Sequence, residues 1–211
     1  MSGDYHAARF TPDLRRAALW RALWRLHFQK LIAAEDCVLD LGAGYGEFIN
    51  AVVARRRIAI DAWPGFTRYL APGVEGVVGR AGDLNFLDDA SVDFALASNL
   101  FEHLTQAEFA TVLAGLRGKL KPSGSLTIIQ PNYRYAFREY FDDYTHKTVY
   151  SHVSLADFLT AHGFVVLECR PRFLPLTLKS RLPVWPWLID AYLRSPIKPM
   201  AGQMLIRARP R

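Results

Sequence analysis

The sequence predicts an α/β protein built on a doubly wound, mostly parallel seven-stranded sheet, with helices on both faces and an antiparallel last strand. Two observations carry this prediction. Short apolar runs alternate with amphipathic segments along the chain, and the first apolar run ends in a glycine-rich turn of the kind found at the carboxyl edge of such sheets. The length of 211 residues and the hydrophobic fraction of 51% suit a single core and exclude a disordered protein.

The elements follow one another at the spacing that this fold needs. An N-terminal helix is expected from about Thr11 to Ala34, because Pro12 and Asp13 suit a first turn and leucines recur at helical spacing. A glycine at Gly163 marks the end of the last predicted helix. Strands are predicted at 37–41, 58–61, 74–78, 92–97, 125–129, 164–168 and 203–208, and further helices at 47–56, 105–120 and 155–162.

The predicted domain has four parts: an N-terminal helical cap (1–35), a central core (36–170), a basic amphipathic insertion (171–201) and the last strand (202–211). The net charge of +6 is unevenly spread over them. Residues 171–211 hold eight Lys/Arg and one acid, a net +7, whereas residues 1–170 carry a net −1. The basic excess therefore indicates an interaction surface built from the terminal parts of the chain.

The glycine-rich turn has the sequence Asp40-Leu41-Gly42-Ala43-Gly44-Tyr45-Gly46-Glu47. Glycines let the backbone approach a ligand closely, and the following helix offers free N–H groups. A dinucleotide fingerprint needs a glycine where this chain has Glu47, which is unfavourable for a pyrophosphate. A nicotinamide- or flavin-dependent oxidoreductase is thus disfavoured, and the P-loop is excluded because no Gly-Lys-Ser/Thr follows.

The D-x-G-x-G-x-G turn resembles the first motif of class I S-adenosylmethionine (SAM)-dependent methyltransferases, in particular the small-molecule, type 11/12-like subgroup, which have a Rossmann-like sheet. The resemblance extends from about Val38 to Phe164. It implies that SAM is the cofactor, that Asp40 orients its amino group, that Asp61 holds the ribose hydroxyls, and that Asp83 and the Leu84 N–H contact the adenine. The cofactor-binding residues that it implies are Asp40, Gly42, Ala43, Gly44, Gly46, Asp61, Ala62, Gly82, Asp83, Leu84 and Asn99.

The methyl acceptor is expected to be a small or lipid-linked molecule, with a hydroxyl as the methylated group and a sugar as one candidate. The loop after the fifth strand is rich in aromatic residues, which suit a wall against a ring-containing acceptor. The expected catalytic residues are His146 as general base, oriented by Asp142 or Asp143, and His103 after the fourth strand. The alternative is that these groups only fix a long loop. The expected substrate contacts are Tyr133, Tyr135, Tyr140 and Tyr144.

No metal is predicted, because the six histidines and two cysteines show no metal-ligand spacing and methyl transfer needs none. Cys37 and Cys169 both lie in apolar runs, which predicts buried thiols in a reducing compartment. The N-terminus lacks a secretory apolar core, and no stretch approaches the length that crosses a bilayer. A cytoplasmic enzyme is therefore expected, as a monomer or a homodimer.

The basic segment 175–199 combines tryptophans with Lys/Arg, as membrane-interface elements do, and Trp20 and Trp24 add to it from the N-terminal helix. It predicts peripheral contact with the inner face of the membrane; packing of the tryptophans on the domain or a dimer interface is the alternative. Nucleic acid is not the expected substrate, because Ser98-Asn99-Leu100-Phe101 replaces the Asn/Asp-Pro-Pro-aromatic motif of base-amine methyltransferases. RNA methylation and a non-catalytic, cofactor-binding or membrane-associated protein remain as alternatives.

Overall fold

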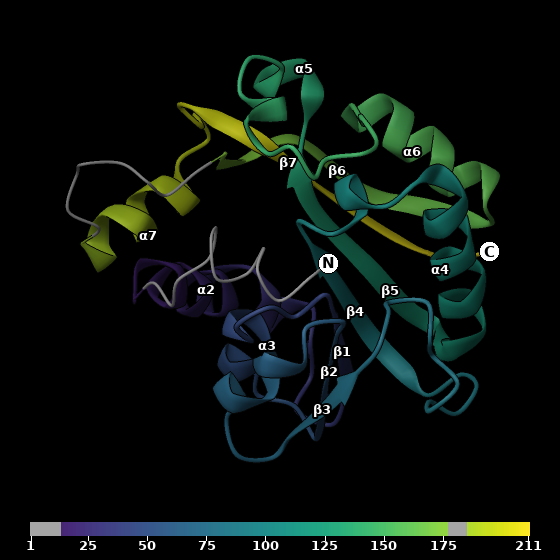
Figure 1. Cartoon of the computed structure of the whole chain (residues 1–211). Coiled ribbons are helices and arrows are strands. Elements are labelled where there is room, and N and C mark those ends of the chain that lie inside the picture. The colour runs from purple at the N-terminus through teal and green to yellow at the C-terminus, as the bar shows by residue number, and fades with distance from the viewer. Residues whose placement is uncertain (1–13, 177–184) are drawn as a thin grey trace. The chain divides into compact units, whose positions relative to one another are not determined.

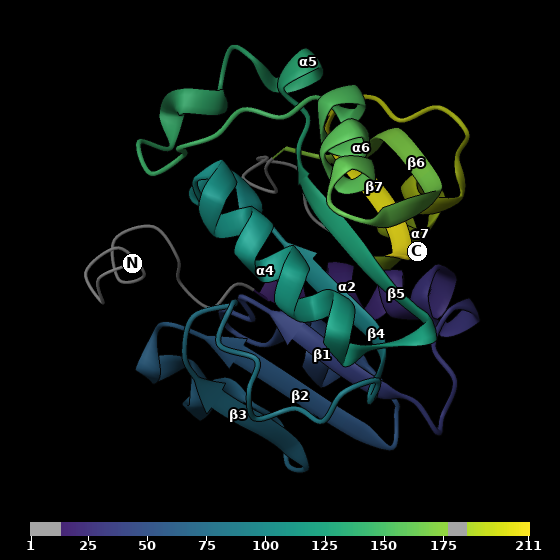
Figure 2. The same cartoon turned by 90° about the vertical axis from the view of Figure 1, so that its right-hand side faces the viewer.

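The computed structural model describes residues 14–176 and 185–211, which form two compact units. The first unit contains residues 14–80 and 185–197, and the second contains 81–176 and 198–211. Each unit is built around its own group of strands (Figures 1 and 2). The expected helix start at Thr11–Asp13 and part of the expected membrane segment, 177–184, lie outside the described residues.

The first unit has three parallel strands, β1 (Cys37–Leu41), β2 (Arg56–Asp61) and β3 (Val74–Val78), with β2 in the middle. All five residues of β1 are buried, as expected for a strand covered on both faces. Leu41 pairs with Ile60. The turn after β1 and the acid that ends β2 are therefore neighbours at the carboxyl edge of these strands.

The helices of this unit are α2 (Leu14–Leu26), α3 (Glu47–Ala51) and α7 (Pro186–Arg194), with 3₁₀ helices at Phe28–Lys30 and Pro64–Tyr69. Trp20 of α2 is buried, with its ring 6.2 Å from the ring of Phe28 and 5.5 Å from that of Phe48. Its expected membrane contact is therefore wrong: Trp20 is a core residue. Helix α7 packs beside α2 (Figure 1), and Arg25 donates two hydrogen bonds, of 2.6 and 2.7 Å, to Asp190.

The second unit has the strands β4 (Val92–Ser98), β5 (Leu120–Pro131), β6 (Phe164–Pro175) and β7 (Ala201–Pro210). β4 and β5 are parallel, and β7 runs antiparallel between β5 and β6. Strand β5 begins five residues before its predicted start, because the chain around Gly124 lies directly against β4. A Cβ at Gly124 would be 2.7 Å from the Val92 carbonyl oxygen. The seven strands, with an antiparallel last strand, agree with the predicted fold class.

The helices of the second unit are α4 (Gln106–Lys119), α5 (Tyr133–Ala136) and α6 (His152–Ala161), with 3₁₀ helices at Phe101–His103 and Tyr140–Asp142. Capping boxes begin α4 and α6, at Thr105 with Glu108 and at Ser151 with Ser154. α4 lies along β4 and β5 (Figure 2).

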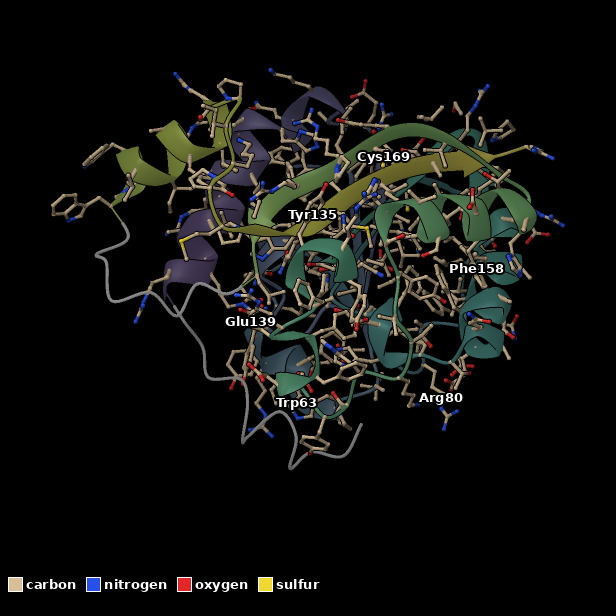
Figure 3. All side chains as sticks on the ribbon, turned by 90° about the horizontal axis from the view of Figure 1, so that it is seen from above. Trp63, Arg80, Tyr135, Glu139, Phe158 and Cys169 are labelled. Carbon is tan, nitrogen blue, oxygen red and sulfur yellow. The ribbon has the colours of Figure 1, made fainter. Side chains whose placement is uncertain are left out.

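The two cysteines differ in burial. Cys37 is buried in β1, but Cys169 is exposed on β6 (Figure 3). The predicted burial of Cys169 is therefore wrong, because several residues of β6 around it face solvent despite their apolar character. No helix within the described ranges 14–176 and 185–211 is long and apolar enough to cross a membrane.

Candidate functional site

The glycine-rich turn after β1 is built from left-handed backbone. Gly42, Gly44 and Gly46 have φ of +69°, +54° and +69°. A Cβ at Gly46 would be 2.9 Å from the Leu70 side chain, whereas one at Gly44 would meet no atom within 4 Å. Glycine is thus required at Gly46 for packing and at both positions for conformation, and the backbone at Gly44 borders open space that a ligand can enter.

Asp61 joins this turn to the end of β2. One carboxylate oxygen accepts a hydrogen bond of 2.8 Å from the Gly44 N–H, and the other accepts one of 2.8 Å from the Trp63 N–H. Each carboxylate oxygen can accept a second hydrogen bond. The carboxylate therefore fits the two ribose hydroxyls of a nucleoside while it holds the turn in place. Ala62, the neighbouring predicted contact, is exposed.

Asp40 is buried at the end of β1. Its burial raises the pKa of the carboxyl well above the usual range, and the negative charges of Glu47 and Asp61 raise it further. Glu47 is itself paired with Arg16 of α2, at 3.1 Å. Three acids in this small region would repel the negative charge of a pyrophosphate, and they would attract a ligand that carries a positive ammonium and a positive sulfonium group. The residues present thus fit SAM.

An aromatic cluster lies next to this turn and was missed by the sequence analysis. The ring of Tyr45 lies 5.3 Å from that of Trp63 and 4.7 Å from that of Tyr69, and the Trp63 and Tyr69 rings are 5.8 Å apart. Trp63 lies two residues after Asp61, the acid assigned to the ribose, so an aromatic residue beside the site could have been inferred from the sequence. The cluster gives the first unit an aromatic surface beside Asp61.

The predicted adenine contacts belong to the second unit. Asp83 is exposed, and the Leu84 side chain is buried. The backbone N–H of Leu84 donates to the Gly82 carbonyl at 3.0 Å, so its predicted availability to a ligand is wrong in this conformation. The tight turn at Gly82 creates that local hydrogen bond.

Asn99 directly follows β4, at the edge where open α/β sheets bind their ligands. Its backbone is left-handed, with φ of +51°, and its N–H donates to the Ile129 carbonyl at 2.8 Å. Its side-chain oxygen accepts from the Gln203 amide at 3.3 Å. These bonds fix Asn99 at the end of the strand.

The two histidines that were predicted as catalytic lie together, with ring centroids 4.9 Å apart. Glu102 completes the group: the ligand atoms of Glu102, His103 and His146 all lie within 4.8 Å of one another. Burial raises the pKa of Glu102 to about 8 and lowers that of His103 to about 4. At neutral pH His103 is therefore uncharged. Glu102 was missed because only His103 was singled out as catalytic in the segment after the fourth strand.

Hydrogen bonds define how both imidazoles are oriented. The Nδ1–H of His146 donates to the Tyr140 carbonyl at 2.6 Å. The Thr145 hydroxyl donates to Asp143 at 2.6 Å and accepts from the Nδ1–H of His103 at 3.0 Å. Both rings thus carry their basic lone pair on Nε2. Asp142 or Asp143 was expected to orient His146; instead, the Tyr140 carbonyl accepts the Nδ1–H of His146, and Asp143 orients His103 through Thr145.

The predicted aromatic wall is only partly exposed. Tyr133, Tyr135 and Tyr144 are exposed, and Tyr135 lies beside β6, where the Arg172 guanidinium is 5.2 Å from its ring (Figure 3). Tyr140 is buried, and its hydroxyl donates to the Thr148 carbonyl at 2.5 Å. The predicted contact of Tyr140 with substrate is therefore wrong, because this side chain is the interior support of the loop.

Asn132 is a second residue that the sequence analysis missed. It is fully buried at the end of β5, and its side-chain amide donates to the Pro171 carbonyl at 2.8 Å and to Nδ1 of His152 at 3.1 Å. It thereby joins the aromatic loop to α6 and β6. The Asn132-Tyr133 junction is therefore a structural anchor for the predicted acceptor loop.

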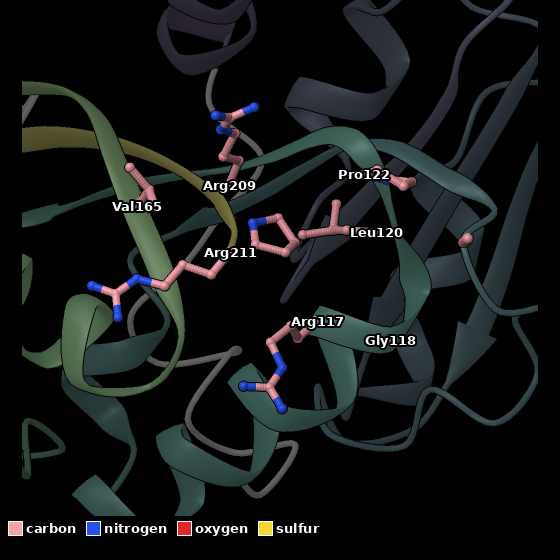
Figure 4. A pocket seen from close by; sticks show the side chains of 9 residues that line it. Arg117, Gly118, Leu120, Pro122, Val165, Arg209 and Arg211 are labelled. Carbon is pink, nitrogen blue, oxygen red and sulfur yellow. The ribbon is translucent and has the colours of Figure 1, made fainter.

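A cavity of about 710 Å³ lies at the other end of the second unit (Figure 4). Its lining includes Leu120 at the start of β5, Val165 near the start of β6, and the arginines 117, 209 and 211. The amino ends of β5 and β6 border it, whereas Asn99 and Asn132 follow the carboxyl ends of β4 and β5. It is therefore separate from the predicted catalytic edge.

Comparison with known proteins agrees with this geometry. A family model described as "Methyltransferase domain" matches residues 39–128. No curated protein matches the chain. A chain of the complex between the Haloferax volcanii Trm112 methyltransferase activator and a putative methyltransferase is 20% identical, with 98% of this chain and 96% of that chain covered and a TM-score of 0.70.

Two further structures share the fold. A SAM-dependent methyltransferase from Archaeoglobus fulgidus is 21% identical over 97% of both chains, with a TM-score of 0.68. The 1,6-didemethyltoxoflavin-N1-methyltransferase of Burkholderia thailandensis, with bound 1,6-didemethyltoxoflavin and S-adenosylhomocysteine, is 21% identical over 98% of this chain and 84% of that chain, with a TM-score of 0.63. The chain shares the Rossmann-like fold of these methyltransferases, and residues 39–128 match the methyltransferase-domain model.

Proposed function

We propose that the protein is a class I SAM-dependent methyltransferase, and that it transfers the methyl group of SAM to a hydroxyl of a small or lipid-linked acceptor, with sugars as the first class to test. The observation that carries this proposal is the pair of oriented imidazoles, His103 after β4 and His146 in the loop after β5. A hydroxyl must lose its proton as it attacks the methyl group, so its methylation gains from a nearby base. The Nε2 atom of His146 is the proposed proton acceptor.

The cofactor is proposed to lie against the turn after β1. In this proposal Asp61 accepts hydrogen bonds from the ribose hydroxyls, and Asp40 pairs with the amino group. The glycines and Ala43 border the methionine part. The hydrogen bonds of Asp61 to the Gly44 and Trp63 N–H groups support this assignment, because they fix the carboxylate before the ligand arrives.

A lipid-linked acceptor is supported by the surface of α7. Trp185 and Trp187 stack on each other, with centroids 5.7 Å apart, and both are more than half exposed. Leu188 is also exposed, and Arg194 ends the helix. Exposed tryptophans beside basic residues are typical of membrane-interface elements. We therefore propose that 175–199 contacts an anionic membrane or the lipid part of the acceptor.

Transfer of a radiolabelled methyl group from SAM into fractionated cell extract tests the acceptor. Labelling of a sugar-nucleotide or lipid fraction, in an ether that resists mild base, is the expected result. Labelling confined to RNA would overturn the proposal and favour the nucleic-acid alternative. A control with Asp61→Ala, which is expected to lose cofactor binding, separates enzyme-dependent label from background.

Two matched experiments test the parts of the proposal. Replacing Trp185 and Trp187 by Ala is expected to weaken co-sedimentation with anionic liposomes; wild-type protein that binds no liposome would exclude the membrane contact.

His146→Ala is expected to spare S-adenosylhomocysteine binding and to lower turnover at least about 100-fold. Unchanged turnover and pH profile would exclude His146 as the base.

A further inference from the structure

Glu102, His103 and His146 form a cluster that the sequence spacing did not reveal. Glu102 and His103 come from the 3₁₀ helix after β4, whereas His146 comes from the aromatic loop 43 residues further along. The backbone N–H groups of Lys147 and Thr148 both donate to the Glu102 carbonyl, at 2.8 and 3.2 Å, and hold the two segments together. The fold thus creates a set of two imidazoles and one carboxylate.

The imidazoles are held as metal-binding histidines usually are. Nδ1 of His146 is used by a backbone carbonyl, and Nδ1 of His103 is used by Thr145, which in turn binds Asp143. This chain from carboxylate to hydroxyl to imidazole is the outer shell that fixes the tautomer of a ligating histidine. In both rings Nε2 is therefore the nitrogen whose lone pair would bind a metal ion.

Glu102 is the least expected member of the cluster. Its side chain has no exposed surface, and neither carboxylate oxygen has a hydrogen-bond partner in the described part of the chain. A buried polar group without a hydrogen bond is costly unless it is neutralised or coordinates a cation. A cation held by the two imidazoles would also satisfy the Glu102 carboxylate.

We propose that Glu102, His103 and His146 bind a divalent transition-metal ion. Two nitrogen ligands and one carboxylate are the donor set of His₂Glu zinc sites and of the two-histidine, one-carboxylate iron sites, and they disfavour Mg²⁺ and Ca²⁺, which prefer oxygen. Ligand atoms around such an ion lie about 3–4 Å apart, because metal–ligand bonds are about 2.0–2.2 Å long. The ligand atoms of the cluster lie within 4.8 Å of one another, close to this spacing. This proposal replaces the expectation of no metal that the sequence spacing suggested.

The role of the ion in catalysis deepens the proposed function and rests on it. Binding of the ion does not depend on the proposed function. Three protein ligands leave coordination positions for an oxygen of the acceptor, and a metal-bound hydroxyl is more acidic. With the ion bound, Nε2 of His146 would ligate it, and the acceptor hydroxyl would lose its proton to water. The ion would take over the part proposed for His146 as base; the methyl transfer itself is the same. Metal binding is measured without SAM and without acceptor, so its failure is distinct from failure to transfer methyl groups.

The test is titration of chelator-treated full-length protein with Co²⁺, followed by visible absorption and calorimetry, with Zn²⁺ as competitor. We expect one Co²⁺ per chain, a nitrogen-type absorption band and displacement by Zn²⁺. Glu102→Gln and His146→Ala should each weaken binding at least about 100-fold, and Thr145→Val by about 10-fold through His103. His162→Ala, at the end of α6, is the matched histidine control and should leave binding unchanged.

A second measurement guards against variants that fail to fold. Co²⁺ should raise the thermal midpoint of wild-type protein and of His162→Ala, and should leave that of Glu102→Gln unchanged. Glu102→Gln has the same shape without the carboxylate charge, so its metal-free form should be at least as stable as wild type. The proposal is overturned if wild-type protein binds no Co²⁺, or if folded Glu102→Gln binds it as tightly as wild type.

Discussion

Replacing Asp61 by Ala should impair both the local fold and the cofactor site. The substitution removes the acceptor of the Gly44 and Trp63 N–H groups, two hydrogen bonds of 2.8 Å each. Hydrogen bonds to charged groups contribute about 1.5–3 kcal/mol each to the free energy of unfolding. At this partly buried site, water can bond to the two N–H groups after the substitution and so reduces the loss. The removal of Asp61 also relieves the repulsion that it exerts on Asp40. We expect a loss of about 2–3 kcal/mol in the free energy of unfolding.

The effect on cofactor affinity follows from the same carboxylate. If two ribose hydroxyls donate to Asp61, losing both bonds costs about 3 kcal/mol, or about 100-fold in the dissociation constant of S-adenosylhomocysteine. Asp61→Asn, which keeps one acceptor oxygen, should lie between wild type and Asp61→Ala.

Urea unfolding and calorimetric titration with S-adenosylhomocysteine measure the two effects. Asp157→Ala, an exposed acid on α6, is the control and should change either quantity by less than about 0.5 kcal/mol. If folded Asp61→Ala binds S-adenosylhomocysteine within threefold of wild type, Asp61 does not hold the ribose and the assignment of the site is refuted.

Three further predictions address packing and pH. Gly46→Ala should cost about 1–2 kcal/mol in urea unfolding, because its φ is +69° and the new Cβ would lie 2.9 Å from Leu70; an unchanged midpoint would contradict this. Asn132→Ala should cost about 2–4 kcal/mol in the same assay, since it leaves the Pro171 carbonyl without its donor in the interior; a loss below about 0.5 kcal/mol would show that the anchor is dispensable. Burial lowers the pKa of His152 from its usual 6.5, and its Nδ1 accepts from Asn132 only while the ring is neutral, so stability should fall as pH drops below about 6.5. His152→Gln should unfold with a weaker pH dependence than wild type in the presence of chelator, and identical slopes would contradict the assignment.

Much of the fold was predictable because the strands are marked by local sequence. β1 is a fully buried run, apolar except for Asp40, and it is followed by glycines with left-handed backbone; both features are visible in one short stretch. The ends of the strands were harder to predict. β5 begins at Leu120 because Gly124 allows close contact with β4, and this is a tertiary effect that the run Lys121–Gly124 does not signal by itself.

The site was predictable where residues are close in sequence and unpredictable where the fold joins distant segments. Asp61 follows the apolar run of β2, so its position at the edge of the sheet could be inferred. Tyr140 looked like its exposed neighbours, but the loop folds back and places its ring in the interior, against His146. The meeting of Glu102 with His146 likewise depends on backbone hydrogen bonds between segments that no local pattern connects.

The tryptophans show the same limit. Trp20 and Trp187 occur in similar basic, amphipathic surroundings, yet Trp20 packs on Phe28 and Phe48 while Trp187 is mostly exposed. The difference arises because α2 has α3 and the 3₁₀ helix at Phe28 to cover one face. Amphipathicity predicts that a face is buried but does not say against what.

Titration of the wild-type protein with S-adenosylhomocysteine and, separately, with NAD tests the central claim most directly. The turn after β1, with Asp40, Glu47 and Asp61 around it, predicts one S-adenosylhomocysteine per chain and no measurable binding of NAD, whose pyrophosphate meets three acids. Binding of NAD with no heat from S-adenosylhomocysteine would contradict the account.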